Sequence, residues 1–293
     1  MLFLLLSIIC SVLIGFIFKL YNQYGVDNFQ AIVFNYITCV LCGWAYLGAF
    51  PIGPAADDPG LWLPYATGLG IFFIGGFTCA ALTVKYFGVT ISQIMQKMSI
   101  LVTVPFALVV YHESANIWKI TGVVLALASI ILVNWPQKNT QNDSNGATSY
   151  RHLWWIPLLT WMGAGVIEVT FLWVKGEGYV SPDNVRFIST VFGTAFLLGF
   201  SFAAWNWLRG TMTFSFKNVV GGVVLGIPNF GSMYFLLLAL AKGLEGSFVF
   251  PVINVGIIIA STIGAVTLFR ERLSLFNWLG IALAVGAIIL MAL

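Results

Sequence analysis

Ten long apolar runs constrain this chain more than any other feature of its sequence. Their approximate ranges are 2–18, 29–50, 61–84, 89–111, 117–135, 153–174, 186–207, 218–241, 247–269 and 276–293. Each run is close to the length of about 20 residues that a helix needs to cross a bilayer. The runs lack the alternation of apolar and polar residues that indicates a transmembrane β-barrel. The sequence therefore predicts an all-α, polytopic membrane protein with ten transmembrane helices.

Composition narrows the class of protein further. Hydrophobic residues make up 60% of the 293 residues and charged residues only 8%, whereas a soluble domain carries about 25% charged residues. This excludes a soluble enzyme, a nucleic-acid-binding domain and a disordered chain. The net charge of +3 is too small to indicate a polyanionic partner. We therefore expect the lipid bilayer to surround nearly the whole chain, and we expect no nucleic-acid partner.

A hydrophilic linker divides the apolar runs into two sets of five. It covers residues 136–152 and separates a first predicted domain, 1–135, from a second, 153–293. Residues of the same type recur in the same order 156 to 158 positions apart, namely Lys19 and Lys175, Lys85 and Lys242, and Glu113 and Glu271. We interpret the two halves as repeats. Because five is an odd number, the repeats must insert in opposite orientations, an architecture that places a transporter's substrate site near the bilayer midplane.

The side of the membrane on which the termini lie follows from the basic residues of the loops. One side holds more of them than the other. The positive-inside rule places the richer side in the cytoplasm. This arrangement favours both termini on the outer side.

Lys97 and Glu168 are the ionisable residues that lie well inside predicted spans. A charge at the bilayer centre costs about 2.5–3.5 kcal/mol or more, so such residues are candidates for function. Gln93 and Gln96 share one polar helical face with Lys97, and we predict that these three residues contact a substrate carboxylate or phosphate. The alternative is that Lys97 pairs with Glu168 and only joins two helices. We interpret Glu168 either as the counter-charge to Lys97 or as the group that carries a coupling proton.

Asn254 lies one turn after Pro251, which leaves the carbonyl of Ser247 without its helical donor. A repeat offset of 158 pairs Asn254 with Gln96, which gives side-chain amides at equivalent positions in both halves. Such amides either bind a polar solute or join helices by hydrogen bonds. Further candidates for substrate binding, which packing explains at least as well, are Asn229, Tyr234, Asn35 and Tyr36.

The fifth and tenth predicted helices each carry a small-xxx-small pattern. The patterns are Gly122-x-x-x-Ala126 and Gly280-x-x-x-Ala284. Such faces let helices approach closely. We expect them to serve packing inside the bundle or a contact in a homodimer.

Motifs of catalysis and of metal binding are missing from the sequence. It contains no phosphate-binding loop, no nucleophile elbow and no zinc-protease motif. Cys39 and Cys42 form a single C-x-x-C pair, without the second pair that a zinc site needs. We therefore expect no enzyme activity, no metal and no cofactor.

A glutamate that follows the fourth helix of each half carries a resemblance to a known family. The stretches are Tyr111-His-Glu113 with Trp118 and Gly122, and Leu268-Phe-Arg-Glu-Arg-Leu-Ser274 with Trp278 and Gly280, the latter preceded by Gly246-Ser-Phe-Val-Phe-Pro251. With two five-helix halves, the chain resembles the EamA-type branch of the drug/metabolite transporter superfamily. Glu113 and Glu271 match the motif residues of that family, whereas His112 stands where the family usually has glycine.

The resemblance implies a central cavity lined by the first four helices of each half, with the fifth and tenth at the periphery. It also implies transport of a small metabolite. Lys97 favours an anionic or zwitterionic solute, because a buried ammonium needs a compensating charge. We predict a secondary transporter that works by alternating access. Transport coupled to a proton through Glu168 and exchange without coupling are both compatible with the sequence. The alternative is a flippase for a lipid or lipid-linked sugar, and we expect a bacterial inner membrane as the location.

Overall fold

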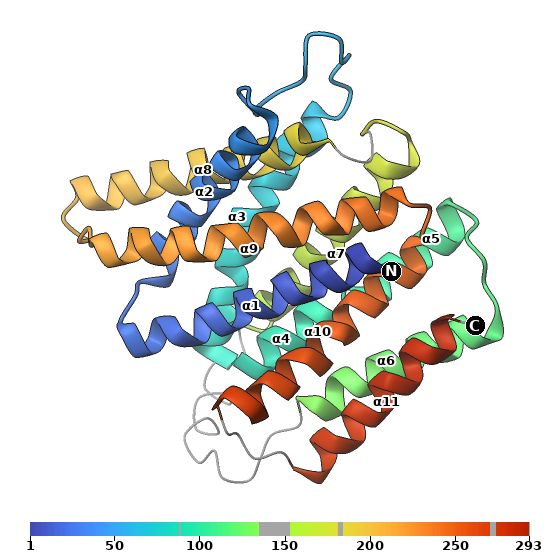
Figure 1. Ribbon diagram of the computed structural model, residues 1–293. Coiled ribbons are helices and arrows are strands. Elements are labelled where there is room, and N and C mark those ends of the chain that lie inside the picture. The colour runs from blue at the N-terminus through green and yellow to red at the C-terminus, as the bar shows by residue number, and fades with distance from the viewer. Residues whose placement is uncertain (88, 135–152, 181–183, 270–273, 293) are drawn as a thin grey trace. The chain divides into compact units, whose positions relative to one another are not determined.

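The computed structural model describes residues 1–293 except 88, 135–152, 181–183, 270–273 and 293. In this described part the chain is helical and has no strand. Figure 1 labels the helices, which are α1 (Leu2–Tyr24), α2 (Asn28–Leu47), α3 (Leu63–Phe87), α4 (Val89–Lys97), α5 (Ile100–Val110), α6 (Ile117–Val133), α7 (Trp155–Gly176), α8 (Val185–Leu208), α9 (Phe216–Ala241), α10 (Gly246–Phe269) and α11 (Leu275–Ala292).

The helices confirm the predicted fold class of a polytopic membrane protein. Within the described residues, eight segments are long and apolar enough to cross a membrane. Two shorter apolar helices, Ile117–Val133 and Leu275–Met291, correspond to the fifth and tenth predicted spans. The fourth predicted span, 89–111, is the one whose helix is interrupted, because α4 ends at Lys97 and α5 begins at Ile100.

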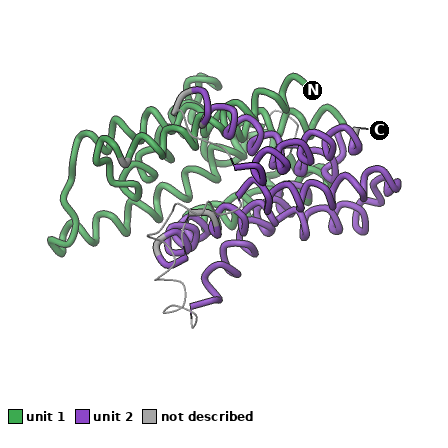
Figure 2. Tube along the Cα trace, turned by 90° about the horizontal axis from the view of Figure 1, so that it is seen from below, with its two compact units in different colours: residues 1–74, 173–243 green, residues 75–172, 244–293 purple. Residues whose placement is uncertain are grey.

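The chain forms two compact units, which Figure 2 distinguishes by colour. Unit 1 comprises residues 1–74 and 173–243, and unit 2 comprises residues 75–172 and 244–293. Each unit therefore combines helices from both predicted sequence domains. The predicted linker, 136–152, lies outside the described residues, and the inverted repeat stays a prediction.

Unit 1 is built around α9, which packs against both α1 and α2, while α2 also packs against α8. Glycines bring the backbones of α9 and α2 together. A Cβ at Gly222 would lie 2.6 Å from the carbonyl oxygen of Ala31, and one at Gly226 would lie 2.9 Å from that of Asn35. Larger side chains would therefore force these helices apart.

Unit 2 contains a second close helix pair, α6 and α11. A Cβ at Gly122 would lie 2.9 Å from the carbonyl oxygen of Ala287, and one at Gly280 would lie 2.6 Å from the nitrogen of Val133. The glycines of both small-xxx-small patterns thus serve packing within the chain. A homodimer through other faces of these two helices stays a prediction.

An apolar cluster fixes α5, α6 and α10 against one another in unit 2. Ile100, Val104, Ile130 and Ile258 form it, and each of these side chains is buried. This cluster holds α10 beside the interrupted span, which places Asn254 next to the end of α4.

Candidate functional site

The interruption between α4 and α5 is the first element of the candidate site. Around it the helical hydrogen bonds shorten from i→i−4 to i→i−3, for example from Leu101 N to Met98 O at 3.0 Å and from Val102 N to Ser99 O at 2.8 Å. Such tight turns inside a helix often mark a functional hinge. The indole of Trp161 on α7 donates to the carbonyl of Met98 at 2.9 Å. The backbone at the interruption is therefore held from outside its own helix.

Four polar side chains meet beside this interruption. Lys97 Nζ donates to Asn254 Oδ1 at 3.1 Å, and Asn254 Nδ2 donates to Glu168 Oε1 at 3.2 Å. The hydroxyl of Thr103 donates to the other carboxylate oxygen of Glu168 at 2.6 Å. We call Lys97, Asn254, Glu168 and Thr103 the polar network. It joins α4, α5, α7 and α10, all within unit 2.

Chemistry fixes the direction of each bond in the polar network. An ammonium can only donate, and an ionised carboxylate can only accept. The amide oxygen of Asn254 must therefore face Lys97, and its NH₂ group must face Glu168. The ammonium and the carboxylate are thus linked through an amide, whereas the alternative drawn from the sequence was a direct pair.

Burial differs among the members of the polar network. Asn254 is 5% exposed and Thr103 is 0% exposed. Lys97 and Glu168 are partly exposed. Asn254 is therefore more enclosed than either of the two residues that it joins.

The predicted glutamines lie apart from the polar network. Gln93 and Gln96 are exposed, and the amide of Gln96 donates to the carbonyl and the hydroxyl of Ser92, both at 3.3 Å. Asn254 was paired with Gln96 at an offset of 158. In the structure Asn254 contacts Lys97, and the equivalence of Asn254 and Gln96 in the two repeats stays a prediction.

The other predicted polar residues lie in unit 1 and are divided between two places. Asn229 on α9 donates to Asn35 on α2 at 3.1 Å, and Asn35 is buried. Tyr36 is 4% exposed and stacks on Phe192. Tyr234 donates its hydroxyl to Tyr46 at 2.9 Å in an exposed position. The asparagines thus join α2 to α9, and neither tyrosine takes part in that pair.

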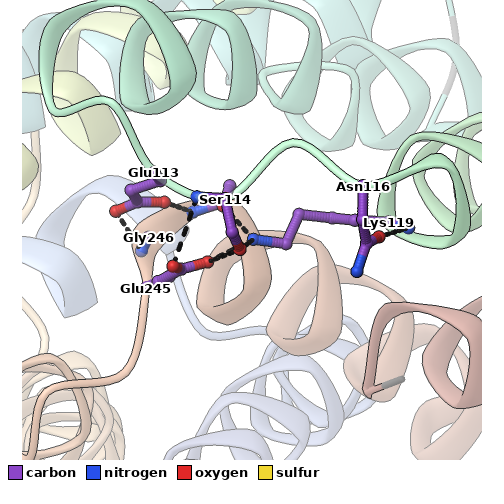
Figure 3. Close-up of polar contacts among 7 residues, drawn as sticks. Glu113, Ser114, Asn116, Lys119, Glu245 and Gly246 are labelled. Carbon is purple, nitrogen blue, oxygen red and sulfur yellow. Dashed lines mark hydrogen bonds and ion pairs between the residues drawn. The ribbon is translucent and has the colours of Figure 1, made fainter.

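Glu113 accepts two hydrogen bonds from the first turn of α10 (Figure 3). Its oxygens receive the backbone N–H groups of Gly246 and Ser247, each at 2.8 Å. A carboxylate stabilises a helix N-terminus, because it satisfies free donors and complements the helix dipole. Glu113 is therefore a cap for the helix that carries Asn254. Its counterpart in the second half, Glu271, lies outside the described residues.

Lys119 forms a salt bridge with Glu245 beside this cap. Lys119 is 5% exposed, and it also donates to the hydroxyls of Ser114 at 2.8 Å and Ser247 at 3.1 Å. Burial alone would raise the pKa of Glu245, but the hydrogen bonds from Lys119 and Ser114 outweigh it and hold that pKa below its ordinary value. Sequence reasoning missed Lys119, because a lysine in the first turn of a transmembrane helix normally faces the membrane surface.

Unit 1 also contains a polar pocket of about 460 Å³ at the ends of α2 and α7. Its charged lining residues are Asp57, Asp58 and Arg186. The indole N–H of Trp62 and the backbone N–H of Gly60 lower the pKa of Asp58. Sequence reasoning did not select these residues, because charges in loops and at helix ends are ordinary. Among the described residues no group of three His, Cys, Asp or Glu side chains lies close enough to hold a metal ion.

Comparisons with known proteins show which family this chain is similar to. Residues 1–135 match the EamA-like transporter family, which belongs to the drug/metabolite transporter superfamily, so the predicted resemblance is confirmed. An uncharacterized protein of Haemophilus influenzae (strain ATCC 51907 / DSM 11121 / KW20 / Rd) is 29% identical over 297 residues. These cover 97% of this chain and 95% of that protein. A solved crystal structure covers 99% of this chain and 94% of its own at a TM-score of 0.75 and 14% identity, and this likeness concerns the fold alone.

Proposed function

Since residues 1–135 are EamA-like transporter sequence within an integral, multi-pass membrane protein, we propose that this chain is a secondary transporter of a small polar metabolite. The solute is anionic or zwitterionic, and it moves by alternating access. One observation carries the proposal. The polar network sets an ammonium and a carboxylate inside two apolar segments that are long enough to cross a membrane, Ile91–Val110 and Trp155–Gly176.

The energetic cost of these charges supports a functional role. Ionisable residues in spans are expensive and mark substrate or ion pathways. A packed apolar substitute for a buried ion pair is often as stable or more stable. Apolar residues would therefore hold these helices together at least as well as Lys97 and Glu168 do. A role in solute binding explains the presence of the two charged residues better.

The sequence positions of Lys97 and Asn254 also support a substrate site at the polar network. Lys97 and Asn254 are 157 residues apart, which falls within the offsets of 156 to 158 that relate the predicted repeats. A contact between equivalent residues of inverted repeats would lie on their pseudo-twofold axis. Transporters of that architecture bind substrate there, between helices that are interrupted. The break after Lys97 supplies such an interruption, and Pro251 lies inside α10, which stays continuous.

Glu168 is the residue we propose for coupling to a proton. Its carboxylate is the acidic group of the polar network, and its two oxygens accept bonds from Asn254 and Thr103. A proton on Glu168 would remove the charge that balances Lys97 and would favour an anionic solute. We place the protein in a bacterial inner membrane, a location that the relative from Haemophilus influenzae supports.

Binding and transport by purified protein test the proposal. Wild type in nanodiscs is screened for thermal stabilisation against pools of soluble metabolites, and hits are assayed for uptake into proteoliposomes. A ligand at about 100 times its Kd stabilises the folded state by about 2.7 kcal/mol. We expect a charged solute whose uptake is lost in Lys97→Met but retained in Lys242→Met, an exposed lysine at the end of α9.

Two results would contradict the transporter proposal. One is uptake of the hit at the wild-type rate by Lys97→Met and Glu168→Gln, which would remove the polar network from the pathway. The other is the absence of any soluble ligand together with movement of a fluorescent phospholipid between leaflets, which would favour the flippase.

A further inference from the structure

A second cavity of unit 1 has almost entirely apolar walls, and we call it the apolar pocket. It has a volume of about 360 Å³ and lies between the start of α2, the last turns of α8 and the connection from α8 to α9. Its lining includes Val33, Phe34, Phe200, Ala204, Trp207 and Phe214. Because α2 and α8 are long and apolar enough to cross a membrane, hydrocarbon rather than water surrounds this part of both helices.

The amide of Gln30 is the polar group that α2 contributes to the lining, and the protein itself binds both of its ends. Its Nε2 donates to the carbonyl of Thr213 at 2.8 Å, and its Oε1 accepts from Asn218 Nδ2 at 3.0 Å. Gln30 is also 7% exposed. A polar solute would have to break these bonds to be recognised, whereas an apolar group would leave them intact. The lining therefore favours a hydrocarbon occupant.

Two tryptophans indicate the depth of the apolar pocket in the membrane. Trp205 and Trp207, in the last turn of α8, are 55% and 62% exposed. Exposed tryptophans at the ends of spans lie at the level of the lipid headgroups. A phospholipid beside the pocket would thus have its headgroup level with the end of α8, and its chains would extend toward Phe200 and Ala204.

Two basic residues lie where the headgroup of such a lipid would be. Arg209 directly follows α8, and Lys217 lies in the first turn of α9, next to the Asn218 that binds Gln30. Both are exposed, and neither forms a salt bridge with a described residue. The guanidinium carbon of Arg209 lies 4.4 Å from the centroid of the Trp205 ring. Stacking on a ring leaves the N–H edge of a guanidinium free to bind phosphate.

Asp27 is an acidic residue beside this pair. Its backbone N–H donates to Asn218 Oδ1 at 3.0 Å, and its carboxylate caps α2 by accepting the N–H of Gln30 at 2.8 Å. This single negative charge is outnumbered by Arg209 and Lys217. Basic residues at a membrane surface attract anionic headgroups, so the charge here complements an anionic lipid.

We propose that unit 1 binds one anionic phospholipid, with an acyl chain in the apolar pocket and its headgroup beside Arg209 and Lys217. The proposal does not depend on which solute the protein transports, because the polar network belongs to unit 2.

Two lipids with identical chains test the headgroup and the chain separately. The probes are dioleoyl phosphatidylglycerol, which is anionic, and dioleoyl phosphatidylcholine, which is zwitterionic. Full-length protein is delipidated in mild detergent, and lipid binding is followed by native mass spectrometry and by thermal shift. We expect one saturable site that prefers phosphatidylglycerol by about tenfold, since two basic residues favour its charge.

Filling the apolar pocket should weaken both lipids alike. Ala204→Leu places a larger side chain in the pocket, so both lipids should lose affinity while their ratio stays that of wild type. Ala81→Leu makes the same change at an exposed position of α3 and should bind both lipids as wild type does.

Removing the basic residues should affect only the anionic lipid. Arg209→Gln combined with Lys217→Gln should bring the ratio of the two affinities close to one and leave the binding of phosphatidylcholine unchanged. Lys242→Gln, at an exposed lysine that follows α9, should keep the preference of wild type.

Three results would overturn the proposal. The first is equal binding of both lipids by wild type, or a preference that survives the loss of Arg209 and Lys217. The second is unchanged lipid binding by Ala204→Leu. The third is a dimer of the delipidated protein that Ala204→Leu disrupts, because the pocket would then hold a second copy of this chain. Since Arg209 and Lys217 are exposed, their variants test the proposal even if Ala204→Leu fails to fold.

Discussion

Removing the carboxylate of Glu113 should destabilise the protein by uncapping α10. Glu113→Ala leaves the N–H groups of Gly246 and Ser247 without their acceptors. Both residues are buried. An unpaired buried donor costs about 1–3 kcal/mol, and because Glu113 itself is partly exposed, water recovers part of the loss. We expect a decrease of about 3 kcal/mol in the free energy of unfolding, toward the low end of the sum of two such costs.

Glu113→Gln refines this prediction, because it keeps the shape and one acceptor oxygen. It loses the negative charge at the helix N-terminus and one of the two hydrogen bonds. We therefore expect about half the effect of alanine, or about 1.5 kcal/mol. Unfolding of micellar protein by added dodecyl sulfate, followed by the fluorescence of the 11 tryptophans, measures both variants. The matched control is Glu177→Ala, an exposed glutamate.

Two results would refute the capping argument. If Glu113→Ala lies within about 0.5 kcal/mol of wild type, as surface substitutions do, the bonds to α10 contribute little. If alanine and glutamine cost the same, the charge rather than the pair of bonds is what matters.

Two further predictions concern unit 2. Gly122→Ala should lower the melting temperature, because its Cβ would lie 2.5 Å from Met291 Cγ. Gly286→Ala, whose Cβ meets open space, should raise the melting temperature through helix propensity. Equal shifts of the two variants in thermal melts would contradict the close packing at Gly122. The lowered pKa of Glu245 predicts a stabilisation that is present above its ordinary pKa of 4.5 and is lost as the pH falls through the folded-state pKa. The difference in melting temperature between wild type and Glu245→Gln should therefore be constant from neutral pH down to about pH 5 and shrink below it, and a constant difference down to pH 3 would contradict the salt bridge with Lys119.

The fold was predictable because the bilayer leaves few choices. An apolar run of about 20 residues must be helical there, since every backbone polar group needs an internal partner. The interruption after Lys97 was missed for a physical reason. Pro105 removes a donor only from the carbonyl of Leu101, and the polar residues before the break were read as one face of a continuous helix.

Sequence reasoning selected three of the four residues of the polar network, Lys97, Glu168 and Asn254, but not how they are connected. Lys97 and Glu168 stood out through the cost of charge in a span. Their link through Asn254 depends on how α4, α7 and α10 pack, and neighbouring positions on a helix point about 100° apart. Gln96 is therefore exposed, whereas the next residue, Lys97, meets Asn254. Thr103 gave no signal, because threonine is ordinary in a membrane helix.

His112 combines a departure in sequence with a strain in structure. Its φ of 50° makes it the one non-glycine residue with a positive φ in the described part of the chain, and it stands where the family usually has glycine. The left-handed conformation costs an L-residue about 1–2 kcal/mol, while glycine costs about 0.5–1 kcal/mol through the entropy of the unfolded chain. His112→Gly should therefore stabilise the protein by about 0.5–1 kcal/mol, since the side chain is exposed and little packing is lost. His112→Ala keeps the strain and should give no gain in the same thermal melts. A lower melting temperature for glycine than for histidine would mean that the His112 side chain itself stabilises the turn that brings Glu113 to α10.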